Sequence, residues 1–427
     1  MLDINLIRSD PKKVSAALMK KDYEVDFSEL LQWDISRREL IRDNEQLKAK
    51  RNKVSAEIPK MKKQGLDVAA ISAEMKLTSE QIRHDDLLIS EFEEKINEFL
   101  ALLPNIPADD VVAGDKENNE VIRVYGEPPS FSFEPKNHID LVKSLDLVDY
   151  ERGAKVGGHG FWMYKGDGAL LEWALINYFI DDHIKDGYEF ILPPHILNYQ
   201  CGYTAGQFPK FEGDVFSLVK QEGKSSAQFL LPTAETVLVN VHRDEILDED
   251  ELPKKYFAYT PCYRREAGSA RTEERGMIRG HQFNKVELVN YTMPENSDNA
   301  LEGLVEKAER LMKGLGLHYR VSKLAAQDCS YSMAKTYDIE VWIPSMGIYK
   351  EVSSASNAMD YQARRGNMKF RRKGLAKSEF MHTLNASGLA TSRVFPAMLE
   401  QLQMEDGSVK LPPVLAQRLG KDVLYPI

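Results

Sequence analysis

The sequence is poor in cysteine and contains no long apolar run. Its three cysteines, Cys201, Cys262 and Cys329, lie far apart, form no CxxC pair and have no histidine cluster beside them. This argues against a zinc site and a disulfide framework, and it suits a reducing compartment. No apolar stretch approaches the roughly 20 residues that a membrane-spanning helix needs, and the first residues lack the pattern of a signal peptide. We therefore expect a cytoplasmic protein without a membrane segment.

The usual phosphate-binding motifs of parallel sheets are missing as well. The chain has neither a GxxxxGK[ST] loop nor a GxGxxG turn, which argues against a P-loop or dinucleotide-binding fold. Its 427 residues are enough for two or three domains. The formal net charge of −10 disfavours a general nucleic-acid coat but leaves room for a local basic surface.

The first hundred residues carry a heptad pattern. Sustained heptads predict coiled-coil packing, and a break at Gln64–Asp67 divides them, so we expect one antiparallel helical hairpin. Pro59 should kink or end the first helix near the tip. Polar residues at some seam positions, such as Asn44 and Asp85, make the predicted packing imperfect. The apolar positions are Trp33, Leu40, Leu47, Val54 and Met61 in the first series, and Met75, Ile82, Ile89, Ile96 and Leu103 in the second.

The two predicted helices differ in charge. Residues 31–65 hold ten Lys/Arg against five Asp/Glu, whereas residues 66–100 hold three against nine. Two interpretations fit this difference. Either the two faces attract each other across the seam, or the first helix contacts the phosphates of a polyanion. The second would give binding a steep salt dependence.

After Leu103 the composition changes to PNIPADDVVAGDKENNEV, which is typical of a linker or domain boundary. Beyond it, runs such as YEFILPP, KYFAYTPCYR, HQFNKVELVNYT and YDIEVWIPSMGIYKEVSS are rich in aromatic and β-branched residues and predict strands. Helical segments lie between them, for example Leu170–Lys185 and Asn299–Leu315. The pattern predicts an α+β fold, in which a helical coiled-coil arm precedes a domain built on an antiparallel β-sheet flanked by helices.

The arginine-rich stretch YRREAGSARTEERGMIRGHQFNKVEL is unusual in this acidic chain. If it folds as strand, loop and strand, alternation puts Arg264 and Glu266 on one face of the first strand. Phe283, Lys285 and Glu287 then share a face of the second. A guanidinium binds phosphate oxygens as a fork, an aromatic ring stacks on a base, and a carboxylate holds an ammonium group. The stretch therefore offers the groups that a nucleotide and an amine require.

A purely structural interpretation of the same stretch also fits. The hairpin would then carry cross-strand ion pairs, and the loop arginines Arg271 and Arg275 would pair with Glu273 and Glu274.

Three other segments combine polar groups in ways that suggest chemistry. Glu351 and Ser354 follow an apolar strand, and a carboxylate with a hydroxyl suits Mg²⁺, which prefers oxygen ligands and substrate phosphates. Thr233 and Glu235 lie at a strand-to-helix junction, where a simple helix start explains them equally. The segment 364–373 holds six basic residues and is either a solvated edge strand or a polyanion contact.

Taken together, these stretches resemble the seryl-tRNA synthetase family of the bacterial type, which is a class II aminoacyl-tRNA synthetase family. The resemblance covers nearly the whole chain. It rests on the heptad arm and on an ordered set of strings: LLPNIP, GHGFWMYKGDGALLEWALINYFID, GYEFILPPHI, AGQFPKF, PTAE, YRREAG…RGMIRGHQFNKVEL, EVSSASNAMDYQARR and TLNASGLATSR. It implies that serine is activated with ATP to seryl-adenylate and then transferred to tRNA.

The resemblance also implies roles for individual residues. Arg264 would clamp the α-phosphate, Phe283 would lie under adenine, and Arg393 would meet the far phosphates. The catalytic residues that it implies are Arg264, Glu266 and Arg393. The implied L-serine pocket is Thr233, Ala234, Glu235, Glu287 and Ser387. The implied ATP-binding residues are Arg264, Arg265, Glu266, Arg279, Phe283, Glu351, Val352, Ser353 and Ser354, with Glu351 and Ser354 at an ATP-bound Mg²⁺.

Partners and domain bounds follow from the same resemblance. The arm, residues 1–103, would bind tRNA(Ser), largely by backbone and shape, and tRNA(Sec) is left open as a second substrate. Residues 104–120 would be a linker, and residues 121–427 the catalytic and dimerisation domain of a homodimer. The alternative is a related paralogue that activates another small amino acid or charges a carrier protein.

Overall fold

The structure is a computed structural model of the whole chain, and it describes residues 1–219, 227–266 and 276–427. Its internal contacts divide it into two units. The arm unit comprises Leu2–Ala16 and Glu24–Leu103, and the sheet unit comprises Met1, Ala17–Tyr23 and Pro104–Ile427. None of the helices within the described ranges is long and apolar enough to cross a membrane.

The arm unit is a helical hairpin. After α1 (Ile4–Ser9) and α2 (Pro11–Met19), the long helices are α3 (Ser28–Lys63) and α4 (Ala69–Ala101). The chain turns where the sequence predicts a break, between Lys63 and Ala69. Pro59 lies inside α3, one turn before its end. Because proline has no N–H, the Ser55 carbonyl lacks its intrahelical donor there, and α3 nevertheless continues to Lys63.

Ion pairs connect the two long helices. Arg37 pairs with Glu93 at 3.2 Å, Lys48 with Asp86 at 2.7 Å and Lys50 with Glu74 at 2.7 Å. The pairing of early α3 residues with late α4 residues confirms the antiparallel arrangement. The seam is partly polar, because Asn44 and Asp85 are buried in it. Some of the basic residues of α3 therefore pair with acidic residues of α4 within the hairpin, although exposed ion pairs of this kind add little stability.

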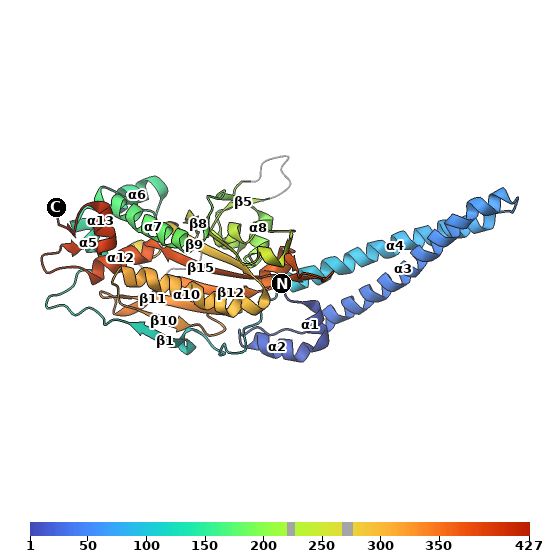
Figure 1. Cartoon of the computed structure of the whole chain (residues 1–427), viewed down its shortest axis with the longest axis horizontal. Coiled ribbons are helices and arrows are strands. Elements are labelled where there is room, and N and C mark those ends of the chain that lie inside the picture. Colours follow the sequence, from blue (N-terminus) through green and yellow to red (C-terminus); the bar gives the residue numbers. More distant parts are fainter. Residues whose placement is uncertain (220–226, 267–275) are drawn as a thin grey trace. The chain divides into compact units, whose positions relative to one another are not determined.

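The sheet unit is built on an eight-stranded sheet (Figure 1). Neighbouring strands are antiparallel except for β4 and β8, which are parallel. This confirms the predicted α+β fold with an antiparallel sheet. In spatial order the strands are β1 (Glu120–Tyr125), β10 (Tyr319–Lys323), β11 (Lys335–Ile343), β12 (Ile348–Met359), β15 (His382–Ala390), β9 (Gln282–Thr292), β8 (Lys254–Tyr263) and β4 (Glu189–Phe190).

Smaller elements surround this sheet. The helices are α5 (His138–Ser144), α6 (Tyr150–Gly157), α7 (Asp167–Lys185), α8 (Tyr199–Thr204), α9 (Glu235–Leu238), α10 (Ser297–Gly314), α11 (Tyr361–Arg365), α12 (Thr391–Gln401) and α13 (Pro413–Leu419). The short sheets pair β2 (Val148–Asp149) with β3 (Met163–Tyr164), β5 (Ile196–Asn198) with β6 (Gln228–Leu230), and β16 (Val409–Lys410) with β17 (Val423–Leu424). A three-stranded sheet joins β7 (Ile246–Asp248), β13 (Lys369–Arg371) and β14 (Ser378–Phe380).

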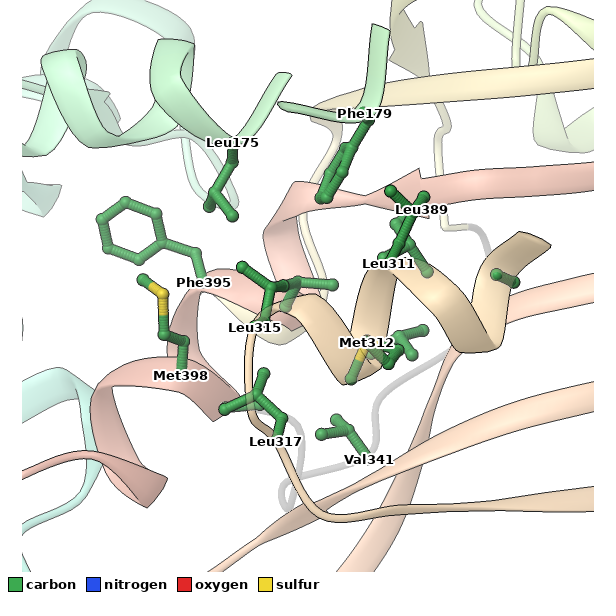
Figure 2. Close-up of a cluster of buried hydrophobic side chains, with 14 of the residues drawn as sticks. Leu175, Phe179, Leu311, Met312, Leu315, Leu317, Val341, Leu389, Phe395 and Met398 are labelled. Atoms are coloured by element: carbon green, nitrogen blue, oxygen red, sulfur yellow. The ribbon is translucent and has the colours of Figure 1, made fainter. Parts of the chain in front are cut away.

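One face of the central sheet is covered by helices, and the main hydrophobic core lies there. Leu175 and Phe179 of α7, Leu311 and Leu315 of α10, and Phe395 and Met398 of α12 pack in this core (Figure 2). Strands β9 and β15 contribute every second residue to it, namely Val286 and Leu288 of β9 and Leu384 and Ala386 of β15, whereas Val352 and Ala355 of β12 lie three residues apart next to a register shift. The intervening residues of these strands point to the other face. That alternation leaves the other face available for a binding site.

The basic segment 364–373 is paired within the sheet unit. Its strand, β13, is the middle strand of the three-stranded sheet, so the edge-strand interpretation is wrong. Arg365 donates to the carbonyls of Tyr203 and Phe208, and the other pairs are Arg364 with Asp360, Arg372 with Glu295 and Glu379, and Lys373 with Asp250. Side chains with partners inside the fold favour a structural role over a polyanion contact.

Candidate active site

Two adjoining cavities open on the face of the sheet opposite α7, α10 and α12. The larger has a volume of about 460 Å³ and the smaller about 80 Å³. A cavity of several hundred Å³ suits a small-molecule ligand. Their lining comes from β9, β12 and β15 and from the ends of β8 and α9. The residues that line both cavities are Arg264, Glu266, Arg279, Lys285, Glu351 and Ser387.

The larger cavity contains a compact polar cluster. Lys285 of β9 donates to the Thr233 hydroxyl at 2.7 Å and forms an ion pair with the Glu287 carboxylate. Asn385 of β15 donates to the other Glu287 oxygen at 3.1 Å. Because Glu287 is only 1% exposed, its charge depends on these partners. Thr233 also accepts a hydrogen bond from the Glu235 amide at 3.2 Å. Its hydroxyl therefore binds a backbone amide at the start of α9 and also lines the larger cavity.

Glu235 has an unusual electrostatic environment. Burial and the nearby Glu287 carboxylate raise the pKa of Glu235 to about 7, against the opposing effects of Gln362, Lys285 and Arg264. The Gln362 amide donates to Glu235 at 2.8 Å. Two carboxylates in one buried cluster favour a cationic ligand, because an ammonium group would relieve their mutual repulsion.

Arg264 lies at the junction of the two cavities. Its Nε donates to the Pro232 carbonyl at 3.2 Å, and its guanidinium carbon lies 5.2 Å from the centre of the Phe283 ring. Arg279 pairs with Glu266 at 2.6 Å beside it. Arg264 therefore presents a fixed guanidinium next to the Phe283 ring. A guanidinium binds a nucleotide phosphate, and an aromatic ring stacks on a base.

The structural basis predicted for Arg264 and Glu266 is wrong in one respect. Strand β8 ends at Tyr263, so strand alternation does not bring the two residues to one face. Glu266 has a φ of +49°, a left-handed conformation that a continuing strand does not adopt. By contrast, Phe283, Lys285 and Glu287 share the open face of β9, as the alternation predicts.

The smaller cavity extends along β9 and β12 towards α12. It is lined by Phe283, Val352 and Arg393 in addition to the shared residues. Arg393 Nη1 donates to the Glu351 carbonyl at 2.8 Å and lies 3.1 Å from its carboxylate. The Arg393 guanidinium therefore belongs to the smaller cavity, which Thr233 does not line.

Oxygen ligands for a cation are present on β12. The Glu351 carboxylate and the Ser354 hydroxyl both line the larger cavity. Beside Ser354, on the neighbouring strand β11, lies its register partner Asp338. Burial and the Glu351 charge raise the pKa of Asp338, and its Oδ1 is buried without a hydrogen-bond partner among the described residues. These hard oxygen donors fit a magnesium ion that also binds phosphate.

Not every predicted site residue reaches a cavity. Ala234 is fully buried behind the larger cavity's lining, Arg265 is exposed and donates to the Gly213 carbonyl, and the Ser353 hydroxyl donates to the Ser387 carbonyl at 2.6 Å. Their direct contact with a ligand stays a prediction. The loop arginines Arg271 and Arg275, with Glu273 and Glu274, lie outside the described residues.

Sequence reasoning assigned no role to three residues of this cluster. Alternation predicts the face of β9 on which Lys285 lies, but the sequence does not indicate its ion pair with Glu287. Asn385 and Gln362 were not singled out. Asn385 lies two residues before Ser387 and therefore shares its face of β15, which is the signal that identifies it.

A buried carboxyl connects three elements behind the cavities. Glu172 of α7 is 4% exposed and accepts hydrogen bonds from Thr391 of α12 at 2.5 Å and from Asn284 of β9 at 2.8 Å. Asn284 lies between Phe283 and Lys285 in the chain, so this contact supports the strand that forms the cavity floor. Burial raises the pKa of Glu172 to about 7 despite these donors.

Glu172→Gln is expected to remove a pH dependence of stability. The folded-state pKa of Glu172, about 7, exceeds its ordinary value of 4.5. Its contribution is therefore fully present below pH 4.5 and is lost as the pH rises through 7. Glutamine keeps an acceptor but does not titrate. Urea unfolding should show the variant more stable relative to the parent at pH 8 than at pH 5, by on the order of 3 kcal/mol. An equal difference at both pH values would contradict this.

Comparison with known proteins agrees with this architecture. Residues 1–107 match the model of the seryl-tRNA synthetase N-terminal domain, and residues 217–402 match that of the class II tRNA synthetase core domain for G, H, P, S and T. Serine–tRNA ligase 2 of Clostridium acetobutylicum is 63% identical, covering 99% of this chain and all of the relative. A crystal structure of seryl-tRNA synthetase from Pyrococcus horikoshii complexed with ATP has a TM-score of 0.92 at 35% identity, covering 100% of both chains.

The antiparallel sheet, its cavity-lining strands and the core-domain match define the protein as a class II aminoacyl-tRNA synthetase. Within that class, the N-terminal match and the full-length identity decide the family. The chain belongs to the seryl-tRNA synthetase family. The alternative of a paralogue for another amino acid or a carrier protein is not favoured by these comparisons.

Proposed function

We propose that the two cavities together bind serine and ATP, and that the serine carboxylate attacks the α-phosphorus at their junction. Family membership makes the chain a serine–tRNA ligase. In the first step a carboxylate oxygen of serine bonds to the α-phosphorus and pyrophosphate leaves. In the second step the terminal ribose hydroxyl of tRNA attacks the seryl carbonyl and AMP leaves. Because the nucleophiles belong to the substrates, the protein's task is positioning and charge stabilisation.

The proposal rests chiefly on Arg264, which lines both cavities. In the larger cavity the Glu235 and Glu287 carboxylates would accept the serine ammonium group, and Thr233 and Ser387 would contact the rest of the amino acid. In the smaller cavity Phe283 would stack on adenine. Arg264 would hold the α-phosphate between them.

Magnesium belongs to the same proposal. Glu351 and Ser354 would hold the ion, with ATP oxygens as its other ligands, and the ion would offset phosphate charge during adenylation. Arg393, which contacts the Glu351 carboxylate at 3.1 Å, would orient that carboxylate and meet the far phosphates.

The arm would bind the tRNA, and the active form would be a homodimer. The tRNA contact is supported by the basic excess of α3. The dimer is supported by exposed apolar side chains on and near α7, of which Leu170 is 59% and Trp173 52% exposed. The molecular mass of the protein in solution tests the proposed homodimer. A cytoplasmic location is consistent with three free cysteines, all buried.

Amino-acid-dependent exchange of pyrophosphate into ATP tests the function directly. Serine should support exchange, while alanine and glycine should be disfavoured by about 10⁴-fold, because the polar groups that contact the serine hydroxyl would be left without a partner. Threonine and cysteine complete the panel. No exchange with any of the five would reject the enzyme assignment, and a preference for another amino acid would reject serine.

A further inference from the structure

One wall of the larger cavity has no regular secondary structure. This wall segment, Ser330–Met333, lies between β10 and β11, and all four of its residues line the cavity that also contains Thr233 and Glu287. The smaller cavity, by contrast, is lined by none of them. A segment outside a sheet lacks ladder partners for its carbonyl groups, so those groups must find donors elsewhere.

Lys21 supplies most of these donors. Its Nζ donates to the carbonyls of Ser330 at 3.0 Å, Tyr331 at 3.4 Å and Met333 at 2.8 Å. An ammonium group has three donor hydrogens and no acceptor, so three carbonyls satisfy it completely. Burial lowers the pKa of Lys21 to about 8, with the Cys329 thiol acting in the opposite direction, and Lys21 therefore stays mostly charged at pH 7.

Asn105 supplies the remaining donors. Its side-chain amide donates to the Ser332 carbonyl at 2.9 Å and to the Ala358 carbonyl at 2.8 Å, and its backbone amide donates to the Tyr331 carbonyl at 2.9 Å. Asn105 is 5% exposed, although it lies in the stretch predicted as a linker. Lys21 and Asn105 together thus satisfy every carbonyl of the wall segment.

The wall segment is also tightly packed from the cavity side. Gly206 lines the same cavity with a φ of +79°, and a Cβ at that position would lie 2.6 Å from the Ser332 Cβ. The Lys210 ammonium lies 3.9 Å from the centre of the Tyr331 ring. A small displacement of the wall segment would therefore change the shape of the larger cavity.

We propose that Lys21 and Asn105 are positioning residues for the amino-acid end of the active site. Neither lines a cavity, and both lie outside the matched core domain, within residues 1–107. They hold the wall segment in place, and the wall segment limits the space available to the amino-acid side chain. They therefore determine serine affinity and the exclusion of the larger threonine. This inference rests on the proposed function, because it assumes that the larger cavity takes the amino acid.

The test is Lys21→Met and, separately, Asn105→Ala in the full chain. Pyrophosphate exchange should show KM for serine raised about tenfold, the size expected for losing a hydrogen bond from a charged group. KM for ATP should stay within about twofold, because the smaller cavity does not include the wall segment. The preference for serine over threonine should fall. Lys21→Arg, which keeps charged donors, should recover part of the loss.

Lys20→Met is the matched control. The Lys20 ammonium also donates to backbone carbonyls, those of Asp109 at 3.3 Å and Val111 at 2.9 Å, but not to the wall segment. It should leave KM for serine unchanged. Melting temperatures of all variants separate loss of fold from loss of positioning, and Asn105→Ala keeps the test decisive if Lys21→Met does not fold.

Three outcomes would overturn the inference. The first is an equal rise of KM for ATP and for serine in Lys21→Met or Asn105→Ala. The second is a rise of KM for serine in the control Lys20→Met. The third is unchanged pyrophosphate exchange with impaired transfer to tRNA, because that result would assign the wall segment to tRNA binding. Failure of the proposed function itself would look different, because the unaltered chain would then show no serine-dependent exchange.

Discussion

Arg264→Ala is expected to reduce serine-dependent pyrophosphate exchange by about 10³-fold or more. Arg264 is fixed by its backbone amide, which donates to the His281 carbonyl at 2.9 Å, and by its Nε, which donates to the Pro232 carbonyl at 3.2 Å. It reaches both cavities, so its positive charge lies where the negative charge of the transition state develops. No other arginine of the described residues lines both cavities apart from Arg279, which is paired with Glu266.

Two further variants make this prediction specific. Arg264→Lys keeps the charge but loses the planar fork, and it should restore only a minor part of the activity. Arg320→Ala is the control, because Arg320 also lies over an aromatic ring, that of Tyr349 at 4.2 Å, and pairs with Glu340, outside both cavities. It should leave exchange unchanged. Exchange within tenfold of the parent in Arg264→Ala would contradict the assigned role.

Removing most of the arm is expected to separate the two half-reactions. The sharpest form keeps the base of the hairpin, including the Arg37–Glu93 pair, and replaces residues 41–89 by the natural turn Gln64–Asp67. Exchange should stay within about twofold, because both cavities are formed by the sheet unit alone. Charging of tRNA should fall by at least about 10²-fold, because the phosphate contacts of α3 are lost.

The complete deletion of residues 31–100 should give the same separation. A variant in which exposed α3 lysines lose their charge, such as Lys53→Gln and Lys60→Gln, provides an intermediate case: its charging defect relative to the parent should be largest at low salt and should shrink as salt rises, because fewer phosphate contacts give a shallower salt dependence. If charging survives the deletions, the arm is not the tRNA-binding element. If exchange is lost with charging, the arm contributes to the folding of the sheet unit instead.

The helical arm was predictable because its pattern repeats. Five heptad positions in α3 and four in α4, with Leu103 just beyond it, determine period, length and turn, and α3 ends and α4 begins within a few residues of the predicted break. The same logic succeeded on β9, where alternation separates Phe283, Lys285 and Glu287 from Val286 and Leu288. A periodic signal survives even when individual positions, such as the buried Asn44, depart from it.

The local geometry of the site was less predictable. Arg264 and Glu266 reach the cavity from the irregular segment after β8, and Glu266 has a positive φ. A non-glycine residue carries no clear signal for that conformation. The same holds for the extra residue on β12 near Val352. The register with β11 shifts there, between Ile339 and Glu340, and no sequence pattern indicates it.

Long-range contacts were the hardest to predict. Lys21 and the Met333 carbonyl are separated by 312 residues, and one lysine among many exposed ones gives no indication of such a partner. Glu172 was part of a matched string, but its contact with Thr391, 219 residues away, depends on how α7 and α12 pack. Such contacts are properties of the tertiary structure alone.

The two-faced sheet has a consequence for how this protein can vary. A single inserted or deleted residue within β9 would exchange the positions of Lys285 and Val286 along the rest of the strand, placing ammonium and carboxylate groups among the core helices and valine and leucine at the substrate. A substitution at one position keeps the alternation of a site strand, whereas a change of length within β9 that no bulge absorbs reverses it for the rest of the strand. Natural length variation should therefore concentrate at places such as the turn Gln64–Asp67, where adding whole heptads to both helices alters neither face of the sheet.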